Sequence, residues 1–211
     1  MEKRIVTNTS QMMKRGSKSV KVIEDSPITR SLLGDVRWAW AWLILRVYVG
    51  WQWIEAGWEK LHSPTWTGAK AGSALTGFVN SALAKTASAH PDVQGWYAWF
   101  LQHAVLPNAV AWSYLVSWGE TLVGIALVLG MFTGIAAFFG SFMNVNYLLA
   151  GTVSTNPILF AIATWLVLAW KTAGWWGLDR WVLPALGTPW SPGYIVHGED
   201  SQGMARQPSK A

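Results

Sequence analysis

The chain of 211 residues contains no cysteine. Disulfides, thiolate nucleophiles, iron–sulfur clusters and dithiol redox chemistry are therefore excluded. Histidine is also scarce, and none lies in a long apolar stretch; the four residues are His62, His90, His103 and His197. Haem ligation between apolar helices is therefore not expected, and no flavin or metal site is predicted. No pattern resembles a nucleophile–base triad or a phosphate-binding loop, so no catalytic residue is assigned.

Charged residues are few as well. They make up 13% of the chain, whereas hydrophobic residues make up 52%. Soluble domains contain about 25% charged residues. The mean hydropathy is positive, at +0.24. The chain contains 17 tryptophans, a residue that prefers the headgroup region of a bilayer. These features predict an integral membrane protein.

The net charge of +5 comes mostly from the tails, so it is better explained by orientation in a bilayer than by nucleic acid. Residues 1–37 contain eight Lys or Arg and four acidic residues. We interpret 1–37 as a basic cytoplasmic arm with a short interfacial piece near Ile28–Val36, and 189–211 as a C-terminal tail. Whether the arm binds lipid is left open.

Four apolar stretches are long enough to be transmembrane helices, for which about 20 residues are required. They cover about residues 38–58, 110–130, 132–150 and 157–178. The connections after the second and third stretches are short, which favours antiparallel neighbours. The sequence therefore predicts an all-α integral membrane protein built as a four-transmembrane-helix bundle over residues 38–188.

The long loop 59–109 is too polar to cross a bilayer, but two segments within it have apolar residues at helical spacing. These segments are Gly72–Ala87 and Gly95–Leu106, the second ending at Pro107. Each is apolar on one side only, so we expect interfacial helices that lie flat on the membrane. Together they are predicted to form a cap over one end of the bundle.

Lys and Arg near the ends of the apolar stretches predict the orientation. Six flank the side of the termini: Lys18, Lys21, Arg30, Arg37, Lys171 and Arg180. The whole loop 59–109 has three: Lys60, Lys70 and Lys85. The imbalance predicts both termini in the cytoplasm and the loop outside.

Polar residues within the apolar stretches are costly and are usually paired. At about 1.5 Å per helical residue, Arg46, Glu120 and Asn144 are expected at similar depth when counted from the inner ends of their helices. Each also lies on a stripe of small residues. We therefore predict an Arg46–Glu120 ion pair with Asn144 hydrogen-bonded to it. Two roles stay open: a structural pin, or a polar pocket for a quinone headgroup or an oxyanion.

Glu55 lies on the opposite face from Arg46 and nearer the outer surface. With Glu59 and His62 it either lines a site under the cap or meets lipid headgroups. His103 shares a face with Trp96, Trp99 and Phe100 in the second loop helix. We keep Glu55, His62 and His103 as candidates for the outer face.

Several motifs resemble the DoxX/DoxD family of small bacterial and archaeal membrane proteins over residues 38–188. They are Leu45-Arg46-x3-Gly50-x6-Gly57-x2-Lys60-Leu61, the run Gly119–Gly130, Asn144-Val145-Asn146-Tyr147, Asn156-Pro157 and Gly177-Leu178-Asp179-Arg180 with Leu183-Pro184. Gly177-Leu178-Asp179-Arg180 and Leu183-Pro184 are similar to the DoxD branch, the large subunit of thiosulfate:quinone oxidoreductase. The resemblance implies a prokaryotic cell membrane and carries over Arg46, Glu120, Asn144 and Asn146 as polar positions.

What the resemblance implies about activity gives a first hypothesis, a subunit that oxidises thiosulfate and passes electrons to membrane quinone. Without cysteine or intramembrane histidine, the substrates must react directly or a partner subunit must help. A second hypothesis is a non-catalytic anchor, assembly or accessory subunit of a respiratory redox complex. A small transporter ranks last, because no helix has paired Gly/Pro interruptions. The oligomeric state is left open.

Overall fold

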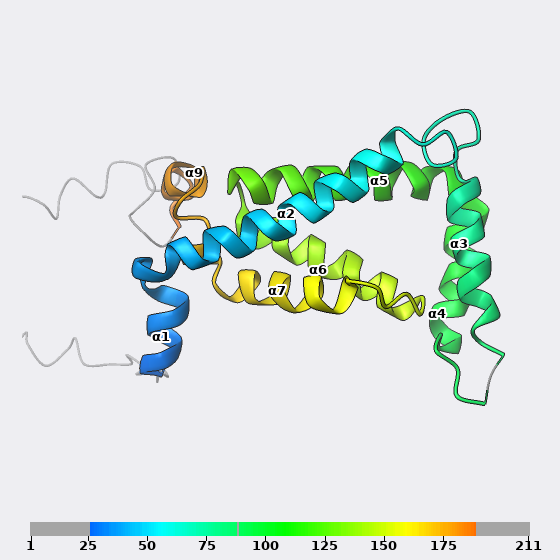
Figure 1. Ribbon diagram of the computed structural model, residues 1–211, viewed down its shortest axis with the longest axis horizontal. Coiled ribbons are helices and arrows are strands. Elements are labelled where there is room, and N and C mark those ends of the chain that lie inside the picture. The colour runs from blue at the N-terminus through cyan, green and yellow to red at the C-terminus, as the bar shows by residue number, and fades with distance from the viewer. Residues whose placement is uncertain (1–25, 88, 189–211) are drawn as a thin grey trace, which may run out of the picture.

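The computed structural model describes residues 26–87 and 89–188, and every regular element within these ranges is a helix (Figure 1). The all-α prediction is confirmed for the described residues. The basic arm up to residue 25 and the tail 189–211 lie outside them. In chain order the helices are α1 (Pro27–Gly34), α2 (Ala39–Leu61), α3 (Ser73–Ala84), α4 (Gly95–Phe100), α5 (Ala109–Leu129), α6 (Thr133–Leu149), α7 (Asn156–Leu168), α8 (Trp170–Ala173) and α9 (Asp179–Ala185).

The four long helices α2, α5, α6 and α7 lie side by side, with α2 packed along α5 and α6 along α7 (Figure 1). Their shared interior is apolar and includes Trp42, Val49, Trp53, Leu127 and Leu166. Between helices in a membrane, such an interior is held together by van der Waals packing of these side chains.

Glycines set the register between α2 and α5. A Cβ atom at Gly57 would lie 2.6 Å from the backbone nitrogen of Thr121, and one at Gly124 would lie 2.7 Å from the carbonyl oxygen of Gly50. Only a residue without a side chain allows two helix backbones to approach so closely. The Gly50 turn of α2 therefore lies against Gly124, and the Gly57 turn lies against Thr121.

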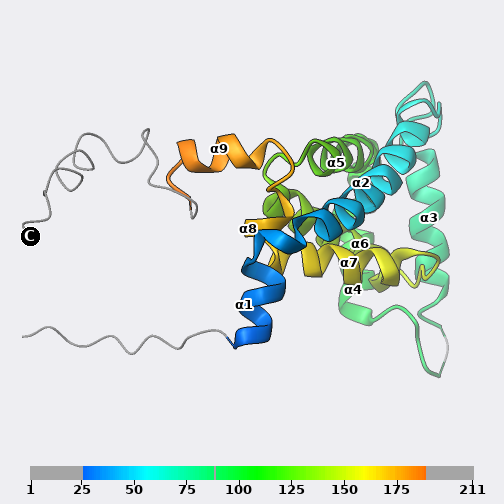
Figure 2. The same ribbon diagram turned by 60° about the vertical axis from the view of Figure 1, so that its left-hand side comes forward.

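Short helices cover both ends of the long ones. Helices α3 and α4 lie across the end where α2 finishes and α5 begins, whereas α1 and α9 lie at the opposite end (Figures 1 and 2). We call the segment 62–108, which includes α3 and α4, the cap. A second apolar cluster, with Leu75, Val79, Val93, Tyr97 and Leu101 among its members, holds the cap together.

The second cap helix does not stop at Pro107 as predicted. A turn of π-helix (Leu101–Val105) and a turn of 3₁₀-helix (Leu106–Asn108) join α4 to α5. Pro107 lies in the first turn of that 3₁₀ segment, where a missing N–H costs nothing. The run Gly95–Leu129 is therefore one helix of 35 residues, and it is long and apolar enough to cross a membrane.

The fourth predicted helix, 157–178, is shorter than expected. Helix α7 has 13 residues and ends at Leu168, and only the four-residue α8 follows before an irregular segment. Helix α6 has 17 residues, and α2 contains Arg46, Glu55, Glu59 and Lys60. Among the described helices, length and composition alone support one membrane span, so the four-span arrangement stays a prediction.

Candidate functional site

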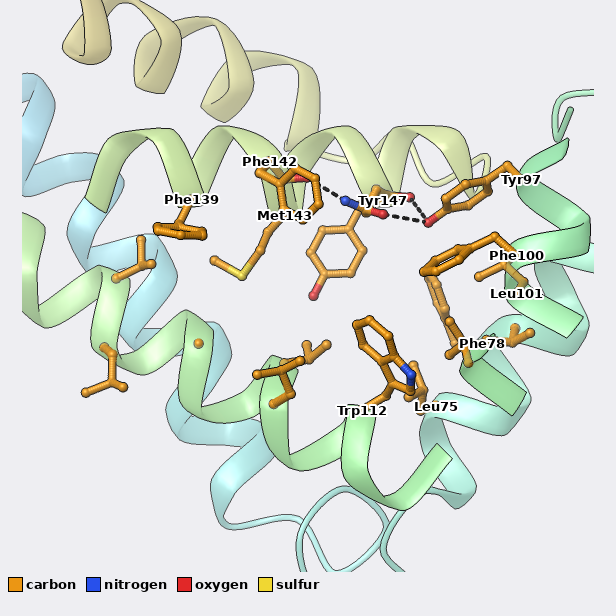
Figure 3. A pocket seen from close by; sticks show the side chains of 18 residues that line it. Leu75, Phe78, Tyr97, Phe100, Leu101, Trp112, Phe139, Phe142, Met143 and Tyr147 are labelled. Carbon is orange, nitrogen blue, oxygen red and sulfur yellow. Dashed lines mark hydrogen bonds between the residues drawn. The ribbon is translucent and has the colours of Figure 1, made fainter. Parts of the chain in front are cut away.

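A cavity of about 440 Å³ lies between the cap and the facing sides of α5 and α6 (Figure 3). Its wall is almost entirely apolar. The residues that line it are Leu75, Phe78 and Val79 of α3; Tyr97, Phe100, Leu101 and Val105 of the second cap helix; Trp112, Leu115, Val116, Gly119, Leu122 and Val123 of α5; and Phe139, Phe142, Met143, Asn146 and Tyr147 of α6. The cavity therefore suits an apolar ligand of small-molecule size.

The mouth of the cavity lies on the side of the molecule. Leu115 and Leu122 of α5 are 60% and 59% exposed, and Phe139 and Phe142 of α6 are 51% and 55% exposed, although all four line the cavity. A cavity whose rim consists of exposed apolar side chains on two neighbouring helices opens between them.

Tyr147 carries the main polar group that faces the cavity. Its hydroxyl points toward the centre of the space in Figure 3 and donates a hydrogen bond to Oε1 of Glu120. Glu120 is 1% exposed, and its Oε2 forms an ion pair with Nζ of Lys60 at 2.7 Å. Neither Glu120 nor Lys60 lines the cavity. They form a charged pair behind the tyrosine, which satisfies a carboxylate that would otherwise be buried alone.

Asn146 supplies the second polar position at the cavity. The hydroxyl of Tyr97 donates to the backbone oxygen of Asn146 at 3.0 Å and to its Oδ1 at 3.2 Å, and the Asn146 amide donates to the carbonyl of Phe142 at 2.8 Å. These bonds attach the cap to α6 beside the cavity. Asn146 thus holds the cavity wall in place as well as lining it.

The predicted Arg46–Glu120 ion pair is wrong. Arg46 is 1% exposed and donates from Nη2 to the carbonyl of Trp176 at 3.1 Å. Its guanidinium occupies the space where a side chain at Gly130 or Gly177 would stand. Glu120, near the middle of α5, instead pairs with Lys60 in the last turn of α2.

The error lies in the register rather than in the helical faces. The prediction counted depth from Trp38 and Gly130 as if both marked the inner surface. The glycine contacts instead place Gly50 against Gly124, so Arg46, one turn before Gly50, lies level with the end of α5 at Gly130. Spacing within each helix cannot reveal such a shift between helices.

Asp179 provides the opposite charge near Arg46 and was not among the predicted site residues. Its two carboxylate oxygens accept the backbone N–H groups of Phe132 and Thr133, at 2.6 Å and 2.8 Å. These are orphan donors at the start of α6, where a negative charge is favourable. The inner cluster of Arg46 and Asp179 therefore fastens the irregular C-terminal segment to the turn between α5 and α6.

Asn144 is fully buried, but it does not join a pair of Arg46 and Glu120 as predicted. Within the described residues its amide has no hydrogen-bond partner, and the same holds for Nε1 of Trp53. Both lie near Tyr147, because Asn144 precedes it by one turn and the Trp53 ring stacks on it at 6.5 Å. A polar region therefore continues behind the cavity wall.

The candidates for the outer face are not brought together with the cavity. Glu55, His62 and His103 are all exposed, and none lines it. The Nδ1 atoms of His62 and His103 lie 2.9 Å and 2.8 Å from the carbonyl oxygens of Trp58 and Trp99, one turn earlier in the chain. Each histidine thus bonds to its own helical segment.

Lys60 and Tyr147 were missed as site residues, although both continue the stripes that the sequence shows. The stripe Arg46, Gly50, Trp53, Gly57 reaches Lys60 three residues later, and Asn144 reaches Tyr147 in the same way. Extension of each stripe by one helical step finds the cluster. The apolar cavity cannot be found in this way, because it forms only where the cap meets α5 and α6. No local sequence pattern marks it.

One described helix, Gly95–Leu129, is long and apolar enough to cross a membrane. Residues 41–152 match the family model described as DoxX, a membrane family, and the match covers more than half of the chain. The chain therefore belongs to the DoxX family. No curated protein matches the chain, and no solved structure matches it.

Proposed function

We propose that this protein binds an isoprenoid quinone in the lateral cavity and serves as the membrane subunit of a quinone-linked oxidoreductase of the DoxD type. The observation that carries the proposal is the cavity itself, about 440 Å³ of apolar space with the Tyr147 hydroxyl inside it. A quinone needs an apolar slot with one or two polar groups. In this arrangement α2, α5, α6 and α7 cross a prokaryotic cell membrane, with the cap outside and both termini inside.

The position of the mouth supports a ligand that arrives from the bilayer. The rim residues Leu115, Leu122, Phe139 and Phe142 face the surroundings of α5, which lies within the 35-residue apolar run. An isoprenoid tail leaving between α5 and α6 would remain in lipid. The headgroup would lie deeper, where a ring oxygen reaches Tyr147.

The electrons would come from a sulfur compound through a partner subunit, because a chain without cysteine has no thiol couple of its own. With thiosulfate as donor, two thiosulfate ions join through a new S–S bond to form tetrathionate and release two electrons. Quinone takes up these electrons and two protons and becomes quinol. The family resemblance of the motifs motivates thiosulfate as the donor.

The cavity can be blocked at Gly119, which lines it in α5. A Cβ atom there meets only Sδ of Met143, at 3.7 Å, so a longer side chain would extend into the space. Gly119→Leu should weaken binding of decyl-ubiquinone about tenfold or more, because overpacking costs about 1–3 kcal/mol. Quenching of tryptophan fluorescence in nanodiscs measures this, since Trp112 lines the cavity.

Gly77→Leu is the matched control, because Gly77 is also helical and a Cβ atom there meets nothing within 4 Å. It should bind decyl-ubiquinone as the wild type does. Equal binding by wild type and Gly119→Leu, or no binding by the wild type, would contradict the proposal.

The second function, a non-catalytic anchor or assembly subunit of a respiratory complex, is favoured by the exposed cap residues Trp96 and Trp99, at 63% and 61%. Large exposed aromatic side chains are typical of protein interfaces. Under this alternative a redox complex co-purifies with the protein and keeps its quinone-dependent activity when Gly119→Leu fills the cavity. Loss of that activity would instead support quinone binding.

A further inference from the structure

We propose that Tyr147, Glu120 and Lys60 form a proton path between the cavity and the cap-side surface. The inference rests on the proposed quinone function, because the path would serve a ligand that takes up protons as it is reduced. It assigns Lys60 and Tyr147 a role in proton transfer. In this proposal Glu120 also transfers protons and does not bind the ligand.

Direct contacts link the three side chains. The Tyr147 hydroxyl donates to Oε1 of Glu120, and Nζ of Lys60 lies 2.7 Å from Oε2 of the same carboxylate. Exposure rises along the series on the side away from the cavity, from 1% for the Glu120 side chain to 18% for that of Lys60. Lys60 also lies 5.2 Å from the ring centre of Trp66, within the cap. The path therefore begins at the cavity and ends at the cap side.

The surroundings isolate this path from other charges. Among the described residues, the further charged group that acts on Glu120 is Glu59, which is itself exposed. The Trp53 ring covers Tyr147 on one side. The unpartnered amide of Asn144 and Nε1 of Trp53 offer hydrogen bonds beside the path. In a low-dielectric environment the hydrogen bonds of such a series strengthen one another, and their continuity is what we infer a proton can follow.

Each step moves one proton and no electrons. When the quinone is reduced, the Tyr147 O–H turns from Glu120 and gives its proton to the ring oxygen. Lys60 gives a proton to Oε2 of the Glu120 carboxylate, rotation of the carboxyl group carries it to Oε1, and Oε1 passes it to the Tyr147 oxygen. Water at the cap surface then reprotonates Lys60. Two passages deliver the two protons of the quinol, and the two electrons come from the donor.

The experiment uses the full chain in nanodiscs with decyl-ubiquinone, an electrode as electron source and infrared difference spectroscopy as the readout. Time-resolved spectra during reduction of the bound quinone should show a transient carboxyl C=O band in the wild type, because Glu120 is protonated only while a proton passes. Glu120→Gln should abolish this band and slow quinone reduction about 100-fold, the scale of a lost proton-transfer group. Its affinity for decyl-ubiquinone should stay within twofold of the wild type, because Glu120 does not line the cavity.

Lys60→Met combined with Glu120→Gln removes both charges together, so neither is left buried alone and folding is preserved. This double variant should be as slow as Glu120→Gln. Tyr147→Phe should be slow as well. Glu55→Gln, which changes an exposed carboxylate on the helix that carries Lys60, should behave as the wild type and keep the carboxyl band.

Three results are distinguishable. Slow reduction with retained quinone affinity supports the proton path. Quinone binding with unchanged rate and carboxyl band in both Glu120 variants overturns the path and leaves the proposed function standing. Absence of quinone binding in the wild type overturns both.

Discussion

Within the described residues, the buried charges fall into two clusters along the long helices. Glu120, near the middle of α5, pairs with Lys60 in the last turn of α2, whereas Arg46 and Asp179 lie at the end of α5. Each buried charge has an opposite charge or several donors near it, as burial requires. The clusters differ in use: one borders a space that a ligand can enter, whereas the other holds backbone segments together.

The inner cluster gives a prediction for Asp179. Asp179→Asn should lower the free energy of unfolding by about 1–3 kcal/mol, because an amide can accept only with its oxygen and leaves one buried N–H of Phe132 or Thr133 unsatisfied. Circular dichroism during unfolding in dodecyl sulfate and dodecyl maltoside mixtures measures the change. Asp92→Asn, an exposed carboxylate in the cap, should change stability by less than about 0.5 kcal/mol. Equal stability of the two variants would argue against the clamp.

Pairs of helices are held at very different spacings. The glycines of α2 and α5 bring their backbones into contact, whereas α5 and α6 are joined by a tight turn at residues 130–132 and are separated by the cavity toward the cap. Gly130 and Phe132 both adopt left-handed conformations in that turn, with φ of 66° and 50°. The α2–α5 contact therefore acts as the rigid side of the site.

Replacement of glycine by alanine should change the free energy of unfolding in opposite directions at two positions. Gly57→Ala should destabilise the protein by about 1–3 kcal/mol, since its Cβ atom would press on the Thr121 backbone. Gly77→Ala should stabilise α3 by about 0.4–1 kcal/mol, because its surroundings are open and alanine favours a helix. Unfolding in mixed detergent measures both. If Gly57→Ala were as stable as the wild type, the contact between α2 and α5 at Gly57 would be less tight than described above.

At this scale the sequence predicts faces well and contacts poorly. The stripe from Arg46 to Gly57, and a second stripe of small and polar residues made of Ser117, Glu120 and Gly124, identify the sides on which α2 and α5 meet. The register of one helix against the other depends on which turn of the neighbouring helix packs against each glycine. The periodicity of a single helix does not contain that information. The cavity was also beyond prediction, because it exists only where the cap meets α5 and α6.

The two ends of the molecule along its long axis are covered by different elements. The cap covers one end, and α1 and α9 cover the other (Figures 1 and 2). At the α1 end, Arg37 bonds to Asp35 through a guanidinium contact at 2.7 Å, and this hydrogen bond lowers the pKa of Asp35. The cytoplasmic location of this end stays a prediction from the Lys and Arg count.

The absence of cysteine makes this topology simple to test, because single cysteines can be introduced without a background. In intact cells, Lys70→Cys in the cap should react with a membrane-impermeant maleimide. Arg30→Cys and Arg180→Cys, at the other end, should react only after the cells are opened. All three residues are exposed, so access to the side chain is not limiting. Labelling of Arg30→Cys in intact cells would overturn the predicted orientation.

The lateral mouth has a consequence for how any ligand is measured. Under the proposed membrane arrangement, a site entered between α5 and α6 is filled by molecules that diffuse in two dimensions within the bilayer, so its occupancy follows their mole fraction in lipid rather than their concentration in water. Diluting the membrane with inert lipid should empty the site at constant total ligand, whereas diluting the buffer should not. A tailless headgroup would compete weakly, because it spends little time where the entrance lies.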